Sequence, residues 1–208
     1  MNSIALIVGL GNPGPEYRNT RHNAGFMLAD LLAERWRAGW RMEKKFFSEI
    51  AECRSEGRRV VLCRPQTYMN ASGQAVSKVA SFFKVAPEDV LVLVDDADLP
   101  LGSLRLRPEG SPGGHHGLES VEKGLGTRTY PRLKVGIARP QQDRRDIASH
   151  VLGQFNPDEQ VVWQAVLKRG VQQVECWLSN GVGVAMNRFN GSLPAGSEKS
   201  TNAERNTQ

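Results

Sequence analysis

The chain reads Val8-Gly9-Leu10-Gly11-Asn12-Pro13-Gly14 directly after an apolar run, and Arg21-His22-Asn23-Ala24-Gly25 follows shortly afterwards. The three glycines of the first segment match the G-x-G-x-x-G pattern of dinucleotide-binding loops. However, Pro13 and Pro15 lack the backbone N–H groups that such a loop offers to a pyrophosphate, and no second strand ends in an acid about 20 residues on. The loop is therefore predicted to expose side chains, which disfavours a nucleotide-binding oxidoreductase.

Length and composition set broad limits on the class of protein. A chain of 208 residues fits one domain with a single core. It contains no run of 18 apolar residues and no basic N-terminal segment before an apolar one, so neither a membrane span nor secretion is expected. Its three cysteines form no C-x-x-C pair, which favours reduced thiols and a cytoplasmic location.

Positive charge gathers in one part of the chain. Between Arg105 and Arg145 there are nine basic residues against four acidic ones, and this excess equals the net charge of +5 of the whole chain. Such a field attracts polyanions, and a nucleic acid is the natural candidate. An ordinary solvated surface is the alternative that charge alone leaves open.

The spacing of apolar residues predicts alternating strands and helices. The predicted strands are Ile4–Val8, Phe46–Cys53, Arg59–Arg64, Val90–Val94, Ser103–Arg107 as an edge strand, and Leu133–Ala138. The predicted helices are Ala24–Trp36, Ala71–Lys84, Leu118–Leu125 and Asp158–Asn180. This order indicates an α/β fold, a single globular domain over residues 1–190 with a twisted mixed β-sheet flanked by helices. Residues 191–208 carry too little apolar surface to fold and are expected to form a disordered tail.

Three polar residues lie just past the carboxyl ends of predicted strands, where open α/β sheets bind ligands. These residues are Asn12, Asn70 and Asp95. His22 lies on the loop that leaves the first strand, so a carboxylate is expected to hold one ring nitrogen while the other accepts a proton. A turn role for Asn12, a helix cap for Asn70 and a plain loop acid for Asp95 are the structural alternatives.

The chain has no G-x-S-x-G nucleophile elbow. A histidine and an aspartate without a nucleophile favour activation of water, and hence hydrolysis, over a covalent intermediate. A second glycine-rich loop contains His115 and His116, but adjacent residues rarely face one ion and no third ligand is suitably spaced, so a metal site is not expected. The loop is predicted to bring one histidine to the rim of the site, with a plain flexible connection as the alternative.

These motifs together resemble those of bacterial-type peptidyl-tRNA hydrolases. The matching segments are Gly9–Gly14 with Tyr17, Thr20–Gly25, Pro65–Gly73 (PQTYMNASG), Asp95–Pro100 (DDADLP) and Gly113-Gly114-His115. They occur in the family's order, and the similarity runs from about Ile4 to Asn187. The resemblance implies an esterase without metal or other cofactor that cleaves peptide from tRNA and recycles the tRNA for translation.

The resemblance also implies roles for individual residues. His22 would be the general base and Asp95 would orient it, while Asn12 and Asn70 would hold the peptide main chain. Tyr17 and Met69 would line the pocket. Arg107 and Lys134 would clamp the 5′ phosphate of the tRNA, and both lie in the basic segment found from charge. Phosphate contacts position a nucleic acid without reading its bases.

Two positions depart from the family's pattern. His116 stands where the family usually has an asparagine that helps to place water or substrate, so the resemblance implies a place for His116 in the substrate site. Glu119 stands where a basic residue is common in the family. The partner implied is tRNA, with no membrane and no metal, and the protein is expected to act as a monomer. A non-catalytic RNA-binding relative, of the type that acts in organelle intron splicing, is the alternative, which the intact His22 and Asp95 disfavour.

Overall fold

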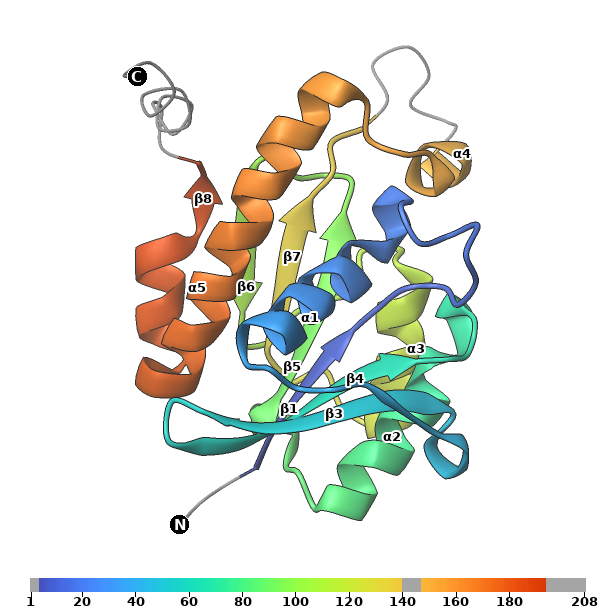
Figure 1. The fold of residues 1–208 in the computed structure, drawn as a ribbon, viewed down its shortest axis with the longest axis vertical. Coiled ribbons are helices and arrows are strands. Elements are labelled where there is room, and N and C mark those ends of the chain that lie inside the picture. Colours follow the sequence, from blue (N-terminus) through green and yellow to red (C-terminus); the bar gives the residue numbers. More distant parts are fainter. Residues whose placement is uncertain (1–3, 140–146, 194–208) are drawn as a thin grey trace, which may run out of the picture.

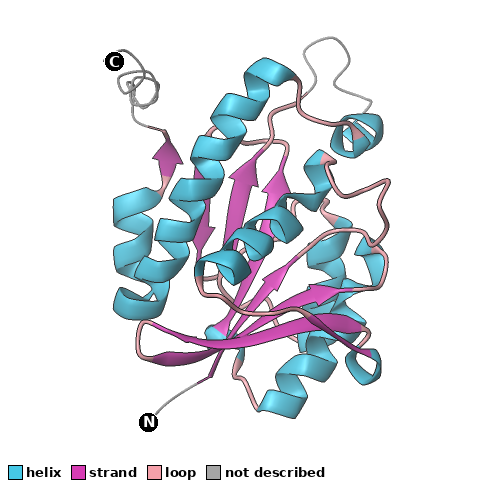
Figure 2. Ribbon diagram, viewed as in Figure 1, coloured by secondary structure: helices cyan, strands magenta, loops and turns pink. Residues whose placement is uncertain are grey.

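The computed structural model describes residues 4–139 and 147–193, which form one mixed sheet with helices on both faces (Figures 1 and 2). The strands are β1 (Ile4–Gly9), β2 (Arg41–Glu43), β3 (Ser48–Ser55), β4 (Arg58–Pro65), β5 (Val90–Asp96), β6 (Ser103–Arg107), β7 (Arg132–Gly136) and β8 (Gly191–Ser192). Their order in the sheet is β2-β3-β4-β1-β5-β7-β6-β8. The central strands β4, β1, β5 and β7 are parallel, and the outer strands pair in the antiparallel sense. The predicted α/β class is confirmed.

The helices divide between the two faces of this sheet (Figure 1). They are α1 (Ala24–Arg35), α2 (Ser72–Phe83), α3 (His116–Leu125), α4 (Ile147–Leu152) and α5 (Pro157–Phe189), with short 3-10 turns η1 (Arg21–Asn23), η2 (Lys44–Phe46), η3 (Met69–Ala71) and η4 (Pro87–Asp89). One core cluster joins α1 and α5 to the sheet and contains Leu28 and Trp163. The other joins α2 and α3 to the opposite face and contains Val76 and Leu118.

Glycines allow the first helix to start directly against the sheet. A Cβ added at Gly25, the second residue of α1, would lie 2.3 Å from the carbonyl oxygen of Leu93 and 2.4 Å from the amide nitrogen of Leu10. A Cβ at Gly9 would lie 2.4 Å from the carbonyl oxygen of Gly25. These contacts leave no room for a side chain, so the glycines serve helix–strand packing and fix η1, which carries His22, beside the strand ends.

The last helix runs further than its apolar stripe predicts. It starts with a capping box, in which Asn156 and Glu159 satisfy each other's backbone N–H groups, and it continues to Phe189 across a kink at Gly181. Gly181 has φ 79°, a conformation that favours glycine, so the chain turns there without strain. The prediction for this helix stopped one residue before that kink.

Several predicted boundaries are corrected. The tail does not begin as disorder at Gly191, because Gly191–Ser192 form β8 against β6, which is therefore not the outermost strand; residues 194–208 lie outside the described residues. The cap of α2 is Ala71 without a side-chain hydrogen bond, so Asn70 does not serve as its cap. Phe46, the predicted start of a strand, belongs to η2.

Candidate active site

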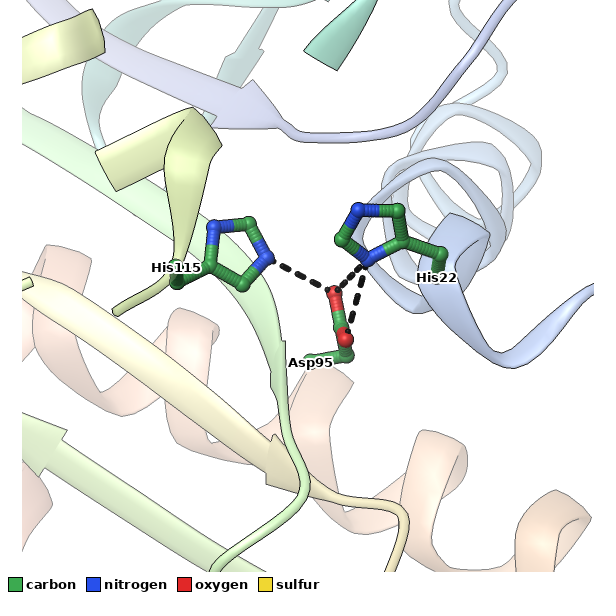
Figure 3. Close-up of side chains that lie close together, drawn as sticks. All are labelled: His22, Asp95 and His115. Carbon is green, nitrogen blue, oxygen red and sulfur yellow. Dashed lines mark hydrogen bonds and ion pairs between the residues drawn. The ribbon is translucent and has the colours of Figure 1, made fainter. Parts of the chain in front are cut away.

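Three side chains from three elements meet at the carboxyl end of the central strands (Figure 3). Asp95 lies near the end of β5, His22 lies in η1, and His115 is the residue before α3. The His22 Nδ1 is 3.0 Å from Asp95 Oδ1 and 3.1 Å from Oδ2, and the His115 Nε2 is also 3.0 Å from Oδ1. One buried carboxylate therefore holds two imidazole rings, and these three residues are called the Asp95 centre below.

The hydrogen bonds around the rings assign their protons. His115 is the N-cap of α3, and its Nδ1 accepts the backbone N–H groups of Gly117 and Leu118 at 3.1 and 3.3 Å. In the neutral ring the proton therefore lies on Nε2, which donates to Asp95. His22 donates from Nδ1 to the same carboxylate, so its Nε2 keeps a free lone pair. That nitrogen can accept a proton.

The charges of the centre support one another. Asp95 is only 4% exposed, and burial by itself raises the pKa of its carboxyl group. His115 and His22 reverse this effect through charge and hydrogen bonding, and the pKa of Asp95 is lowered well below its ordinary range. Burial lowers the pKa of His22, but the charge and hydrogen bond of Asp95 outweigh burial and raise it above the ordinary 6.5. The centre thus places an ionised Asp95 carboxylate beside His22, a base whose pKa this carboxylate raises.

Asn12 is locked beside this centre by a second network. Its backbone N–H donates to Asn23 Oδ1 at 2.8 Å, and Asn23 Nδ2 donates to its carbonyl oxygen at 3.0 Å. Its side-chain Oδ1 accepts the backbone N–H of Met69 at 2.8 Å. Among the described residues the Asn12 Nδ2 has no hydrogen-bond partner, which leaves its NH₂ group held in position to donate to a substrate oxygen.

A cleft of about 600 Å³ opens over these groups. Asn12, His22, Asp95 and His115 form part of its wall. The rest comes from the Asp96–Asp98 turn, the loop 112–114, His116, Lys134, Arg139 and four residues of α4. The cleft is therefore wide enough for a substrate fragment and has both apolar and charged walls.

The other predicted site residues lie in different settings. Met69 is buried, Tyr17 is half-buried and Asn70 is exposed, and none of the three lines the main cleft. Lys134 lines it and forms an ion pair with Asp96 at 2.9 Å. Arg107 is exposed on β6, outside the cleft.

The two adjacent histidines have opposite positions. His115 points to Asp95, whereas the side chain of His116 is 76% exposed and its Nδ1 lies 3.2 Å from Glu119 Oε2. The glycine-rich loop does bring a histidine to the centre, but this histidine is His115, whereas the resemblance assigns the role in the site to His116. Asn23 was also missed as a site residue, although it belongs to the quoted motif and buries its amide against Asn12.

One member of the basic segment is not on the surface. Arg132 is 1% exposed, and its guanidinium donates to the carbonyl oxygens of Gly110 and Arg128 and lies beside Glu122. It contributes to the fold and not to an open basic face. Arg144 and Arg145, also counted in that segment, lie outside the described residues.

The Asp95 centre is also the place to consider for a metal ion. The donor atoms of His22, Asp95 and His115 lie within 4.8 Å of one another, and no other such group of three occurs among the residues described. In the structure these donor atoms already hydrogen-bond to each other. A metal ligated there would have to displace the proton that each ring donates to Asp95. Within residues 4–139 and 147–193, no helix is both long and apolar enough to cross a bilayer.

Comparisons with known proteins identify the family of the chain. The family model described as peptidyl-tRNA hydrolase matches residues 6–200. A peptidyl-tRNA hydrolase from Synechococcus sp. (strain JA-3-3Ab) is 52% identical over 90% of this chain and 83% of its own, and one from Thermosynechococcus vestitus is 47% identical over 91% and 95%. A crystal structure of peptidyl-tRNA hydrolase from Acinetobacter baumannii superposes with a TM-score of 0.88 at 37% identity, covering 94% of this chain and 98% of that one. The chain therefore belongs to the peptidyl-tRNA hydrolase family.

Proposed function

We propose that this enzyme hydrolyses the ester between peptide and tRNA with His22 as the general base. The observation that carries the proposal is the orientation of His22. Its Nδ1 is held by Asp95, and the free Nε2 belongs to a residue that lines the cleft. A base held in this way removes a proton from water without forming a covalent intermediate.

The reaction then proceeds in two steps, attack by water and release of the ribose. His22 Nε2 takes a proton from water as the oxygen attacks the ester carbonyl, which produces a tetrahedral oxyanion and an imidazolium. The C–O bond to the ribose then breaks, and the imidazolium returns the proton to the leaving ribose oxygen. The Asp95 carboxylate stabilises the imidazolium throughout. Asn12 Nδ2 is placed to donate to the substrate carbonyl or main chain, and Asn70 holds the peptide further out.

The tRNA binds through its phosphates. Lys134 lines the cleft, and Arg107 lies on the neighbouring strand β6, so both are available to the 5′ phosphate. Lys134 is paired with Asp96 at 2.9 Å, so phosphate binding requires it to exchange one anion for another. Tyr17 and Met69 support the peptide side of the site. The enzyme works in the cytoplasm as a monomer and needs no metal or other cofactor.

The test is release of an N-blocked amino acid from tRNA in the presence of EDTA. Wild-type protein is expected to release it, and His22→Ala to lose turnover by roughly 10³-fold or more while binding tRNA as before. His150→Gln is the matched control, because this ring binds the carbonyl oxygen of Ala138 and does not line the cleft. Turnover by His22→Ala at a rate near wild type would refute the proposed base.

Two other results would point elsewhere. If wild-type protein binds tRNA but releases no amino acid, the RNA-binding alternative is favoured over the enzyme. If EDTA abolishes turnover and a divalent cation restores it, turnover depends on a metal ion and the proposed metal-free reaction is wrong.

A further inference from the structure

Arg21, the residue before His22, is anchored to a distant part of the chain. Its side chain is 9% exposed, and its Nη2 donates to Glu159 Oε2 at 2.9 Å, across 138 residues. The guanidinium carbon lies 4.5 Å from the centre of the Phe155 ring. Its backbone N–H donates to the carbonyl oxygen of Gly153 at 3.0 Å. Three contacts of different kinds therefore fix this one residue to the segment that opens α5.

The segment that receives Arg21 is itself held rigidly. Phe155 stacks on Trp163, with ring centres 4.3 Å apart and planes 20° apart. Glu159 Oε2, which binds Arg21, also accepts the backbone N–H of Asn156 at 2.8 Å. Thr20 adds a β-bridge to Gln154. Arg21 is therefore attached to a well-packed helix start and not to a loose loop.

Burying this cation is costly for the fold. The Arg21 Nε and Nη1 are buried and have no hydrogen-bond partner within the described parts of the chain. Buried donors without partners are rare, and an apolar side chain in the same space would avoid the loss. This unfavourable burial indicates that Arg21 has a role in positioning its neighbours, beyond stabilising the fold.

The two chain neighbours of His22 are both anchored, which indicates that His22 is the residue being positioned. Asn23, which follows His22, is hydrogen-bonded to Asn12, and Arg21, which precedes His22, is bound to Gly153 and Glu159. Gly153 directly follows α4, and four residues of α4 line the cleft. The two anchors therefore set His22 relative to Asn12 on one side and to the α4 wall on the other.

We propose that Arg21 is a positioning residue for the hydrolysis, which acts through Glu159 and Phe155 to keep the His22 Nε2 aimed at the ester. The inference rests on the proposed function, since it assumes that His22 is the base. It adds that the Arg21–Glu159 ion pair supports the rate of the chemical step and not the binding of tRNA. A small displacement of a catalytic group can lower the rate of that step by about 10²-fold.

The experiment compares Arg21→Gln with Arg35→Gln. The ion pair between Arg35 and Glu175 is the control. The Arg35 Nε lies 3.1 Å from Glu175 Oε1, and this pair joins α1 to α5 away from the cleft. We expect Arg21→Gln to lower kcat by about 10- to 100-fold with KM within about twofold, and Arg35→Gln to leave both unchanged. Thermal unfolding of both variants separates a lost fold from a displaced base.

Two further variants keep the test valid if Arg21→Gln does not fold. Glu159→Gln retains the capping box but removes the charge, so it should lower kcat by several-fold at unchanged KM. Arg21→Lys keeps the charge without the planar fork and should recover part of the rate. Wild-type kcat in folded Arg21→Gln and in Glu159→Gln would overturn the inference. If His22→Ala retained its rate, the proposed base would fail instead, so the two failures are distinguishable.

Discussion

The Asp95 centre and the basic face on β6 and β7, to which the proposed function assigns the chemical step and phosphate binding, have opposite kinds of structure. We define the basic face as Arg105, Arg107 and Lys134, where Arg105 pairs in register with Lys134. In the Asp95 centre a buried carboxylate holds two half-buried imidazole rings at 3.0–3.1 Å. On the basic face, Arg105 and Arg107 are exposed, Lys134 is half-buried and paired with Asp96, and the alternate residues Leu104 and Leu106 fill the core.

The difference follows from what each region must do. Moving a proton requires atoms held at hydrogen-bond distance, and a buried network provides this at low mobility. Attracting a polyanion needs charge that acts over several ångströms in water, and long exposed side chains provide it without a fixed geometry. Substitutions in the Asp95 centre should therefore change kcat, and substitutions on the basic face should change KM and salt dependence.

Asp95→Asn should show the largest effect. The amide can accept from one histidine, but its N–H₂ group faces the other, and His22 then favours the tautomer with the proton on Nε2. In that tautomer Nε2 has no lone pair with which to accept a proton from water. The kcat should therefore fall roughly 10²- to 10⁴-fold, as for the equivalent change in a serine-protease triad. Single-turnover hydrolysis with tRNA binding measured alongside checks this result. A loss confined to KM would contradict the role of Asp95.

The same variant should change the titration of His22. Asp95 raises the pKa of His22 above the ordinary 6.5, so wild-type kcat/KM should be lost as the pH falls through a value above 6.5. Without the anion the pKa of His22 should fall, which moves its titration to lower pH. NMR titration of the four histidines, with His22 assigned through His22→Ala, measures this shift. An unchanged midpoint would mean that the carboxylate does not control the ring.

Lys134→Ala and Arg107→Ala should have intermediate effects of another kind. Each change removes one expected phosphate contact, so KM should rise by up to about tenfold and the slope of log KM against log salt should weaken by about one, with kcat nearly unchanged. Lys123→Ala is the control, because this exposed lysine lies on α3, outside both the basic face and the cleft wall. A fall in kcat alone would contradict the assignment to phosphate.

Much of this architecture could be predicted because it depends on local patterns. The uninterrupted apolar run Val90–Val94 becomes the buried part of β5, and the acid that follows it lies at the sheet edge where ligands bind. The Ser55-Glu56-Gly57 turn predicts the β3–β4 hairpin, which the register confirms. Because β1 and β5 are neighbouring parallel strands, the segment that leaves β1 and carries His22 starts beside the end of β5, where Asp95 lies.

Other features depend on contacts that no local pattern records. The choice between His115 and His116 is made by the backbone at the start of α3, where His115 takes the extended N-cap conformation and its ring turns back to Asp95. The anchor of Arg21 needs Glu159, 138 residues away. Strand β8 has no apolar residue and forms because α5 ends beside β6, where Asn190 hydrogen-bonds to Leu106. Each depends on a neighbour that only the folded chain supplies.

The smallest effect on kcat/KM is expected at the two positions that depart from the family's pattern, His116 and Glu119. These two side chains contact each other and not the Asp95 centre. His116 and Glu119 lie one helical turn apart at the start of α3, with Nδ1 and Oε2 3.2 Å apart. The ring is 76% exposed, so water screens it electrostatically from the Asp95 centre. His116→Asn should therefore change kcat/KM by less than about threefold.

A double-mutant cycle tests whether the pair acts as a unit. Glu119→Lys alone places a cation beside His116, whereas Glu119→Lys with His116→Asn places it beside a neutral amide. If the carboxylate is present to balance the imidazole, the double variant should bind tRNA more tightly than the sum of the single changes predicts. Strict additivity would mean that the two residues are independent. A tenfold loss in His116→Asn alone would mean that this ring reaches the ester and that the division between a buried centre and an exposed rim is wrong.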